Sequence, residues 1–134
     1  MICRKPCRTC PWRKDVTPGA LGGTPPEVHL GQMWGPFWLP CHSTPGYTPR
    51  LDKSLPECVG VAMMRSATGR ADILPSSLLS ADSDGSVFDS PRDFLIHHRG
   101  SDVGVPDDPN LEPLITKFTH NELEMVRLGM THHS

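Results

Sequence analysis

The sequence predicts a small, mostly α-helical, loop-rich domain that is stabilised by a metal bound to a four-cysteine knuckle and continues into a helical C-terminal extension. The 134 residues include 15 prolines and 12 glycines, and only 37% are hydrophobic, so the core must be slight. Three tryptophans and four phenylalanines nevertheless indicate a folded chain, because disordered segments usually lack such residues. All five cysteines lie within the first 58 residues. Small domains with weak cores often use a metal as a staple, and the cysteines can provide one.

Caps and apolar spacing place the expected elements of the first part, residues 1–69. Prolines and glycines punctuate residues 1–23, which predicts a loop. Thr24 can cap a helix that ends near Trp34, because a glutamate follows this threonine at the spacing of a capping box. The apolar run 37–39 predicts a short strand, and residues 58–65 predict the next helix.

The second part, residues 70–134, is expected to be a helical extension. A serine–proline step opens a predicted helix over 90–98, and a glycine follows where a C-terminal cap belongs. Residues 100–113 are rich in proline and aspartate and predict a loop. A capping box at 119–122 predicts the start of a last helix, which runs to Gly129.

Four cysteines are the candidate metal ligands: Cys7, Cys10, Cys41 and Cys58. The C-x2-C step of Cys7 and Cys10 lets two sulfurs converge on one tetrahedral ion, and the other two cysteines complete the four donors of a structural zinc site. A [4Fe–4S] cluster also takes four cysteines and is the alternative cofactor. His42, next to Cys41, is a possible alternative ligand.

Other interpretations of the cysteines fit less well. Isolated buried thiols are expected in apolar surroundings, whereas Cys7 and Cys10 stand among basic and polar residues. A thioredoxin-like pair needs a βαβ unit that the sequence does not indicate. The spacing of Cys3, Cys7 and Cys10 is similar to the cluster motif of radical S-adenosylmethionine enzymes, but their barrel is far larger than 134 residues can form. Cys3 is therefore expected to be a spare thiol.

Residues 7–60 contain an ordered series of motifs. The series starts with Cys7-x2-Cys10-Pro-Trp-Arg-x-Asp, passes through a Pro-Gly step to Cys41-His42, and ends at Cys58-Val-Gly. In this order the segment resembles a family of uncharacterised small four-cysteine proteins of actinobacteria and their phages, known only as a domain of unknown function. The resemblance implies four shared metal ligands and a bacterial or phage origin, and it implies no activity. The chain departs from the family pattern at Val59, where alanine is usual, and throughout the part after about residue 70.

The charge is uneven along the chain, with a formal net charge of −2 overall but five basic and no acidic residues among the first fourteen. A basic cluster beside a metal knuckle can meet an acidic partner, either protein or nucleic acid. The residues expected to form this contact are Arg8, Trp12, Arg13 and Lys14. In the alternative, the charges offset the thiolates and Trp12 shields the metal from water.

The sequence contains no apolar run of about 20 residues and no signal peptide, so we expect a cytoplasmic protein without membrane contact, in a compartment where thiols stay reduced. No nucleophile motif, phosphate loop or pair of catalytic carboxylates indicates a small-molecule substrate. These observations predict a non-enzymatic metal-binding module with a regulatory or phage-related role. A redox-sensing or electron-transfer protein and a structural subunit of a larger assembly are the alternatives.

Overall fold

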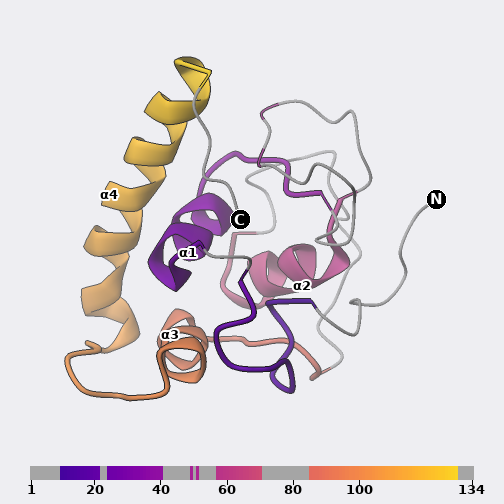
Figure 1. Ribbon diagram of the computed structural model, residues 1–134, viewed down its shortest axis with the longest axis vertical. Helices are drawn as coiled ribbons and strands as arrows, with labels where there is room; N and C mark the ends of the chain where they lie inside the picture. The colour runs from indigo at the N-terminus through magenta and orange to yellow at the C-terminus, as the bar shows by residue number, and fades with distance from the viewer. Residues whose placement is uncertain are drawn as a thin grey trace.

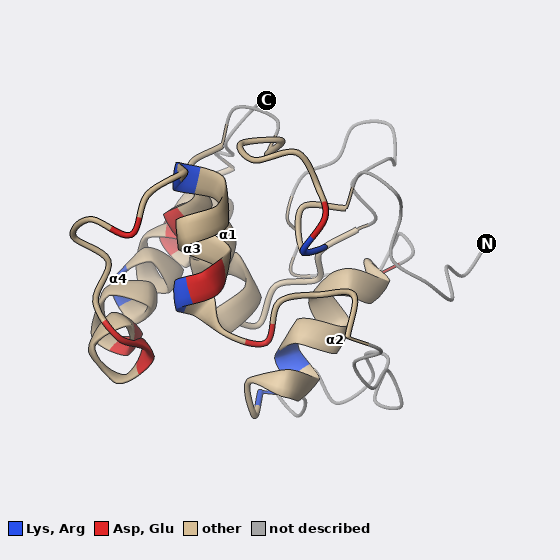
Figure 2. Cartoon of the chain, turned by 90° about the horizontal axis from the view of Figure 1, so that it is seen from below, with Lys and Arg blue, Asp and Glu red and all other residues tan. Residues whose placement is uncertain are grey.

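The computed structural model describes residues 10–21, 24–40, 49, 51, 57–70 and 85–129. Within these ranges the chain forms four helices and no extended strand: α1 (Pro26–Trp34), α2 (Val59–Ala67), α3 (Pro91–Arg99) and α4 (Asp108–Arg127). Figure 1 shows α4 along one side of the molecule, and the view in Figure 2 agrees that α1 and α3 lie between α4 and α2. The expectation of a small, mostly helical fold is confirmed for the described residues.

The first three helices lie close to where the sequence predicts them. In α3, Ser90 Oγ accepts a hydrogen bond from the Asp93 N–H at 3.3 Å, and Gly100 ends the helix with φ +76°, a conformation that favours glycine. At α1 the expected capping box does not form. The N-cap is Pro25 and no side chain caps it, so proline in the first turn takes the place of the Thr24 cap.

The predicted strand at 37–39 is wrong. Pro40 forms an isolated antiparallel bridge with Glu57, and the Cys58 N–H donates to the Leu39 carbonyl at 2.8 Å. Proline has no N–H to donate to a strand ladder, so the pairing does not extend into a sheet. The bridge nevertheless holds the end of this segment against the residues that precede α2.

The start of the last helix is also predicted wrongly. Helix α4 begins at Asp108 and includes the 119–122 box in its interior. Pro109 occupies the first turn, where its missing N–H costs nothing, while Pro113 is tolerated inside the helix. Thr119 does not cap, because its Oγ1 donates to the Gly31 carbonyl at 2.6 Å and to the Ile115 carbonyl at 3.1 Å. Burial against α1 therefore outweighs the poor local propensity of the 108–113 segment.

Helices α1 and α4 pack closely because Gly31 in α1 and Gly35 at its C-cap lie at the crossing. A Cβ on Gly31 would stand 2.7 Å from Phe118 Cβ, and one on Gly35 would stand 2.5 Å from Thr119 Cγ2. A buried hydrogen bond from Gln32 Nε2 to Glu122 Oε1, 2.7 Å long, joins the same two helices. The described residues on both sides of position 70 share one apolar cluster: Leu30, Met33, Phe37, Val61, Met64, Phe94, Leu111 and Ile115 are among its members.

A buried arginine connects α2 to the end of α1. Arg65 is 1% exposed. Its guanidinium donates to the carbonyls of Met33 and Phe37 at 2.8 and 2.7 Å, and to those of Gln32 and Gly35 at longer range. It also lies 3.5 Å from the Glu57 carboxylate, which is equally buried. Carbonyls at a helix C-terminus have no intrahelical partner, so this one side chain satisfies the end of α1 and fixes α2 against it.

Candidate metal centre

Two of the four predicted ligands meet in the structure. The sulfurs of Cys10 and Cys58 are 3.7 Å apart, although the residues are separated by 48 positions in the chain. Both side chains are buried, with exposed fractions of 1% and 5%. The distance is far beyond the S–S bond of about 2.05 Å in a disulfide, so the two sulfurs are not bonded to each other. A loop and a helix start thus bring two soft donors to one buried point.

The backbone of α2 is shaped to receive the Cys10 sulfur. Cys58 is the N-cap of α2, and Gly60 is in the first turn. A Cβ on Gly60 would lie 2.5 Å from Cys10 Sγ and 3.3 Å from Trp12 Cβ, so only glycine leaves room for the thiol at this position. In the sequence Gly60 is only the last residue of the Cys58-Val-Gly motif, and the spacing of residues does not predict its contact with the Cys10 sulfur.

Cys7, Cys41, the alternative ligand His42 and Arg8 lie outside the described residues. Within the part of the chain that the structure describes, no group of three or more His, Cys, Asp or Glu side chains could hold a metal ion. The residue before Cys41 is described, however. Pro40 is bridged to Glu57, the residue before Cys58. The chain therefore reaches position 40 directly beside the start of α2.

The loop that carries Cys10 is anchored by two other segments. Its backbone pairs with residues 86–88: the Lys14 N–H donates to the Ser86 carbonyl at 2.9 Å, and the Phe88 N–H donates to the Trp12 carbonyl at 3.0 Å. Helix α3 supplies two histidines. His97 Nε2 lies 2.6 Å from the Val16 carbonyl. The 10–21 loop is therefore positioned by segments that are distant in the sequence.

His98 is the second of these histidines, and it contacts the 10–21 loop through both ring nitrogens. Its Nδ1 accepts a hydrogen bond from the Gly19 N–H at 3.0 Å, so Nε2 carries the proton and donates to the Pro11 carbonyl at 2.8 Å. Adjacent histidines at 97–98 carry no sequence signal for such a role, because it depends on a loop some eighty residues away in the chain. Burial lowers the pKa of His98 below its ordinary value of 6.5, and the neighbouring His97 acts in the same direction, while the hydrogen bond to Pro11 opposes them.

We expect His98 to make the fold sensitive to acid. A histidine whose pKa is lower in the folded than in the unfolded state stabilises the fold fully above pH 6.5, and this stabilisation is lost as the pH falls through the folded-state pKa. Protonation of Nδ1 also removes the acceptor for the Gly19 N–H. Urea unfolding between pH 7.5 and 5 should therefore show a smaller loss of stability in His98→Gln than in the wild type at equal metal saturation. Equal slopes in the two proteins would contradict this assignment.

The structure corrects the partner-binding prediction for Trp12. This ring is 2% exposed and stacks on Phe94 at 4.6 Å between centroids, so it cannot reach a partner. It belongs to the same buried core cluster as Cys10 and Cys58. From the sequence alone, a tryptophan beside a metal knuckle could either contact a partner or shield the metal from water. The burial of Trp12 favours shielding.

The two described basic residues of the predicted contact lie at the surface of the same loop. Arg13 forms a bidentate ion pair with Asp15, with both N–O distances at 2.8 Å, and this hydrogen-bonded contact holds the pKa of Asp15 below its ordinary value. Lys14, next to it, is exposed. Over the described helices, Figure 2 shows basic and acidic positions interspersed. The two basic residues of this loop are therefore only a small local feature of the charge distribution.

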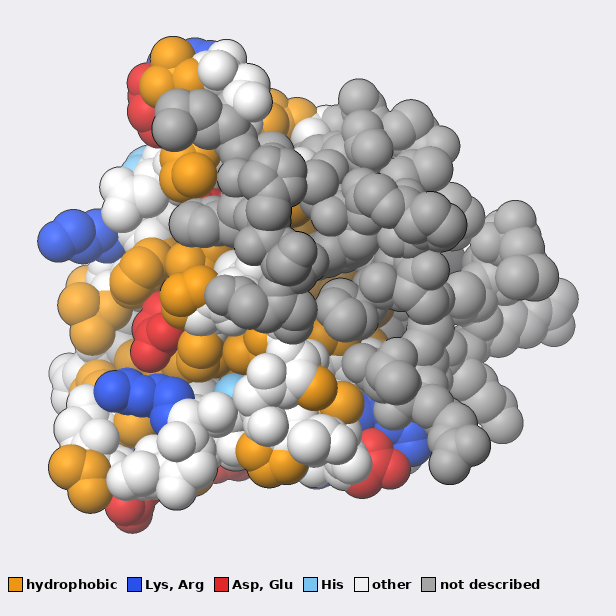
Figure 3. Space-filling view, viewed as in Figure 1, with side chains coloured by type: hydrophobic (Ala, Val, Ile, Leu, Met, Phe, Trp, Pro, Cys, Tyr) orange, Lys and Arg blue, Asp and Glu red, His pale blue; other side chains and the backbone are white. Residues whose placement is uncertain are grey.

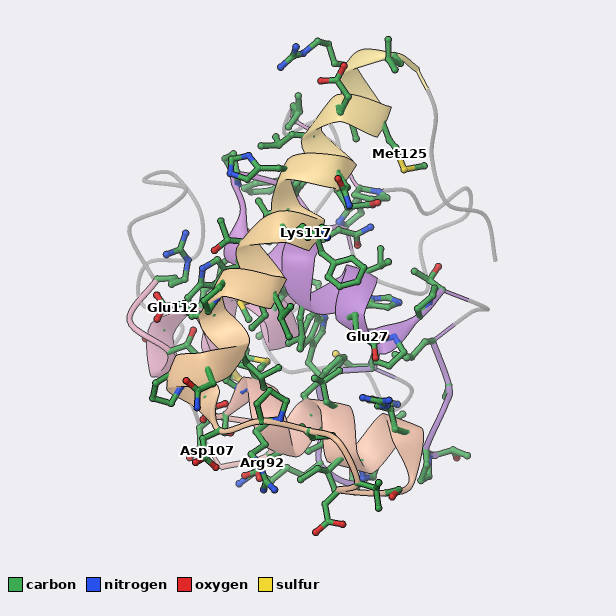
Figure 4. All side chains as sticks on the ribbon, turned by 90° about the vertical axis from the view of Figure 1, so that its left-hand side faces the viewer. Glu27, Arg92, Asp107, Glu112, Lys117 and Met125 are labelled. Atoms are coloured by element: carbon green, nitrogen blue, oxygen red, sulfur yellow. The ribbon has the colours of Figure 1, made fainter. Side chains whose placement is uncertain are left out.

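Two hollows of the described surface have linings that include neither Cys10 nor Cys58. One of about 270 Å³ is lined by Trp34, Thr68, Asp89, Pro91, Asp108, Pro109, Glu112 and Ile115, and neither cysteine nor histidine lines it. Figure 4 shows Glu112 on α4 above the Asp107 and Arg92 pair, whose nearest charged atoms are 3.9 Å apart. Figure 3 shows apolar and charged side chains interspersed on the side formed by α1 and α4.

Comparison with family models, curated proteins and solved structures finds no match to this chain. None of the four helices in the described ranges has the length and apolar character needed to cross a membrane.

Proposed function

We propose that this chain is a non-enzymatic metal-binding module, with zinc at a centre formed by Cys7, Cys10, Cys41 and Cys58, that docks on a protein or nucleic acid partner. The observation that carries the proposal is the 3.7 Å contact between the buried sulfurs of Cys10 and Cys58. Structural zinc sites are closed, whereas catalytic ones keep an open coordination position. The burial of both thiols supports the structural kind.

The other two ligands are proposed from their neighbours in the chain. Cys7 precedes Cys10 at C-x2-C spacing, and Cys41 follows directly after Pro40, which is bridged to the residue before Cys58. Consecutive Cα atoms are about 3.8 Å apart, so both cysteines have the reach to complete the set. The resemblance of residues 7–60 to four-cysteine proteins of actinobacteria and their phages agrees with this ligand set and suggests a regulatory or phage-related role.

The docking surface is proposed at the exposed end of the knuckle loop, where Arg13 and Lys14 follow Cys10 in the chain and Arg8 precedes it. The metal fixes the loop, and the loop presents the charges. A partner with an acidic surface would be bound, and a nucleic acid would show a steep dependence of affinity on salt.

The test uses metal-loaded protein and a matched pair of charge reversals. Lys14→Glu should weaken binding to single- or double-stranded nucleic acid, or to a co-purifying protein, by at least about fivefold, which is about 1 kcal/mol. Lys117→Glu, at an exposed position on α4, should leave binding unchanged (Figure 4). A nucleic-acid affinity that falls steeply with salt identifies that partner class, and salt-insensitive capture of one protein at fixed stoichiometry identifies the other. Equal effects of the two variants would contradict the proposed surface.

A further inference from the structure

Helix α4 carries a second, mostly apolar stripe on its exposed side, and we propose that this stripe pairs with the same stripe of a second copy of the chain. The residues of the stripe follow one another at steps of four, three, four and three: Leu114, Phe118, Asn121, Met125 and, at the C-cap, Leu128. The proposed interface is an antiparallel, two-fold symmetric pair of α4 helices. It lies on a different element from the proposed metal centre and does not rest on it.

The stripe differs from the side of α4 that packs on the rest of the protein. The buried residues of α4, which contacts α1 and α3, are Leu111, Ile115, Thr119 and Glu122. By contrast, Leu114 and Leu128 are 50% and 64% exposed, and Phe118 and Met125 are partly exposed. A surface helix of a monomer typically has one apolar stripe, toward the core, and polar residues elsewhere. A second stripe on the exposed side therefore indicates an interaction surface.

The spacing of the stripe favours another helix as its occupant. Steps of four and three repeat every seven residues, which is the spacing of a coiled-coil seam. From Leu114 to Leu128 the seam is about 21 Å long, because an α-helix rises about 1.5 Å per residue. A helix of the same length with the same seam would cover it, and α4 of a second copy has both properties. Asn121 in the middle is polar, and a polar residue in a seam specifies the partner at some cost in stability.

The charges beside the stripe favour the antiparallel orientation. Lys117 and Glu124 are exposed and lie one heptad apart on the flank of the stripe away from the core. In a parallel pair this flank would have to face the opposite flank of the second helix, where Ile115 and Glu122 are buried within their own chain. In an antiparallel pair the exposed flank faces itself, so Lys117 meets the partner's Glu124 twice by symmetry.

The existing contact of Glu124 does not prevent this pairing. Glu124 lies 3.4 Å from Arg127 Nη1, and both side chains are more than half exposed. Such an exposed pair contributes little stability, so the carboxylate can also accept from a lysine of the second copy. Opposite charges at the edge of a helix pair select its orientation and its partner. The charge pattern of α4 is therefore complementary to itself.

A hollow at the start of the stripe offers a place for a side chain of the second copy. It has a volume of about 80 Å³ and lies between α4 and the two helices beneath it, with Leu111, Leu114, Phe118, Leu30 and Leu95 in its lining. Figure 4 shows Met125 and Glu27, which also lines the hollow, on the same side of α4. In the register that joins Lys117 to the partner's Glu124, the partner's Leu128 lies opposite this hollow. An apolar anchor in a pocket is the usual source of most of the binding energy.

The experiment measures the oligomeric state of the full-length chain by sedimentation equilibrium. The wild type should dimerise with a dissociation constant on the order of 10 µM, because an interface of this length is at the small end of specific complexes. Leu114→Glu should weaken the dimer at least about tenfold, since it places a charge in the seam. Val103→Glu is the matched control: Val103 is 78% exposed, lies between α3 and α4, and should have no effect on the dimer. Both positions are exposed, so circular dichroism should show unchanged helix content in both variants.

A charge exchange tests the orientation. Lys117→Glu should weaken the dimer by about three- to tenfold, and Lys117→Glu combined with Glu124→Lys should restore it. A wild-type chain that stays monomeric up to about 200 µM would overturn the second copy as the occupant, since that is well above the expected dissociation constant. Equal effects of Leu114→Glu and Val103→Glu would overturn the stripe as the interface, and a double variant as weak as Lys117→Glu would overturn the antiparallel pair. The binding test at Lys14 uses nanomolar protein, where every variant is monomeric, so Lys117→Glu remains a control there.

Discussion

Cys58→Ser is expected to abolish cooperative unfolding of the part of the chain around the centre, because it removes one metal ligand and leaves the other buried thiol without its neighbour. Structural zinc contributes apparent binding free energies of about 10–16 kcal/mol, against a net stability of about 5–15 kcal/mol for a typical domain. A chain that depends on the metal therefore loses most of its stability with one ligand. The measurement is thermal unfolding by circular dichroism together with zinc content per chain.

The matched control is Cys3→Ser, since Cys3 is expected to be a spare thiol outside the ligand set. This variant should bind metal and unfold like the wild type. Cys10→Ser should behave like Cys58→Ser, because the two sulfurs share one site at 3.7 Å. Serine keeps the backbone hydrogen bond from position 58 to the Leu39 carbonyl, so the effect reports on sulfur and not on the chain pairing. Wild-type unfolding of Cys58→Ser would exclude Cys58 as a ligand.

Local signals in the sequence were sufficient where structure is set locally. The α3 boundaries follow from the Ser90 cap and the Gly100 stop, both of which operate within a single turn. The chemistry of the side chains predicted the convergence of Cys10 and Cys58. A domain with a weak core needs an additional stabilising group such as a metal ion, and the thiols were the available donors. Both inferences used only residue type and spacing.

The same reasoning failed where tertiary contacts decide. Pro113 and the aspartates of the preceding loop disfavour a helix at 108–118 on propensity, yet Leu111 and Ile115 bury their side chains against α1 and α3, and this burial fixes the helix. Thr119 was expected to cap because a glutamate stands three residues later, but its hydroxyl has a better acceptor in the Gly31 carbonyl. No pattern along the chain encodes the approach of Gly31 to α4.

Arg65→Met is expected to destabilise the protein by about 3–5 kcal/mol, since it breaks a buried ion pair from one side. The substitution keeps most of the apolar stem but removes the guanidinium that lies 3.5 Å from the buried Glu57 carboxylate. It also removes the donor to the Met33 carbonyl, which has no intrahelical partner at the end of α1, and to the Phe37 carbonyl just beyond the helix. The measurement is urea unfolding of metal-loaded protein, with the shift in midpoint converted at a common slope.

Arg70→Met is the matched control, because Arg70 donates to the Trp34 carbonyl at 2.9 and 2.6 Å and stacks on its ring, but is only partly buried. The cost there should be about 1 kcal/mol, the usual value of an accessible hydrogen bond. Adding Glu57→Gln to the Arg65→Met variant should recover part of the lost stability, because it removes the buried carboxylate charge. Because Arg65 fixes α2 against α1 and Cys58 begins α2, Arg65→Met should also weaken metal binding, whereas Arg70→Met should not. Equal unfolding midpoints for the two arginine variants would show that α2 is held by its apolar contacts alone.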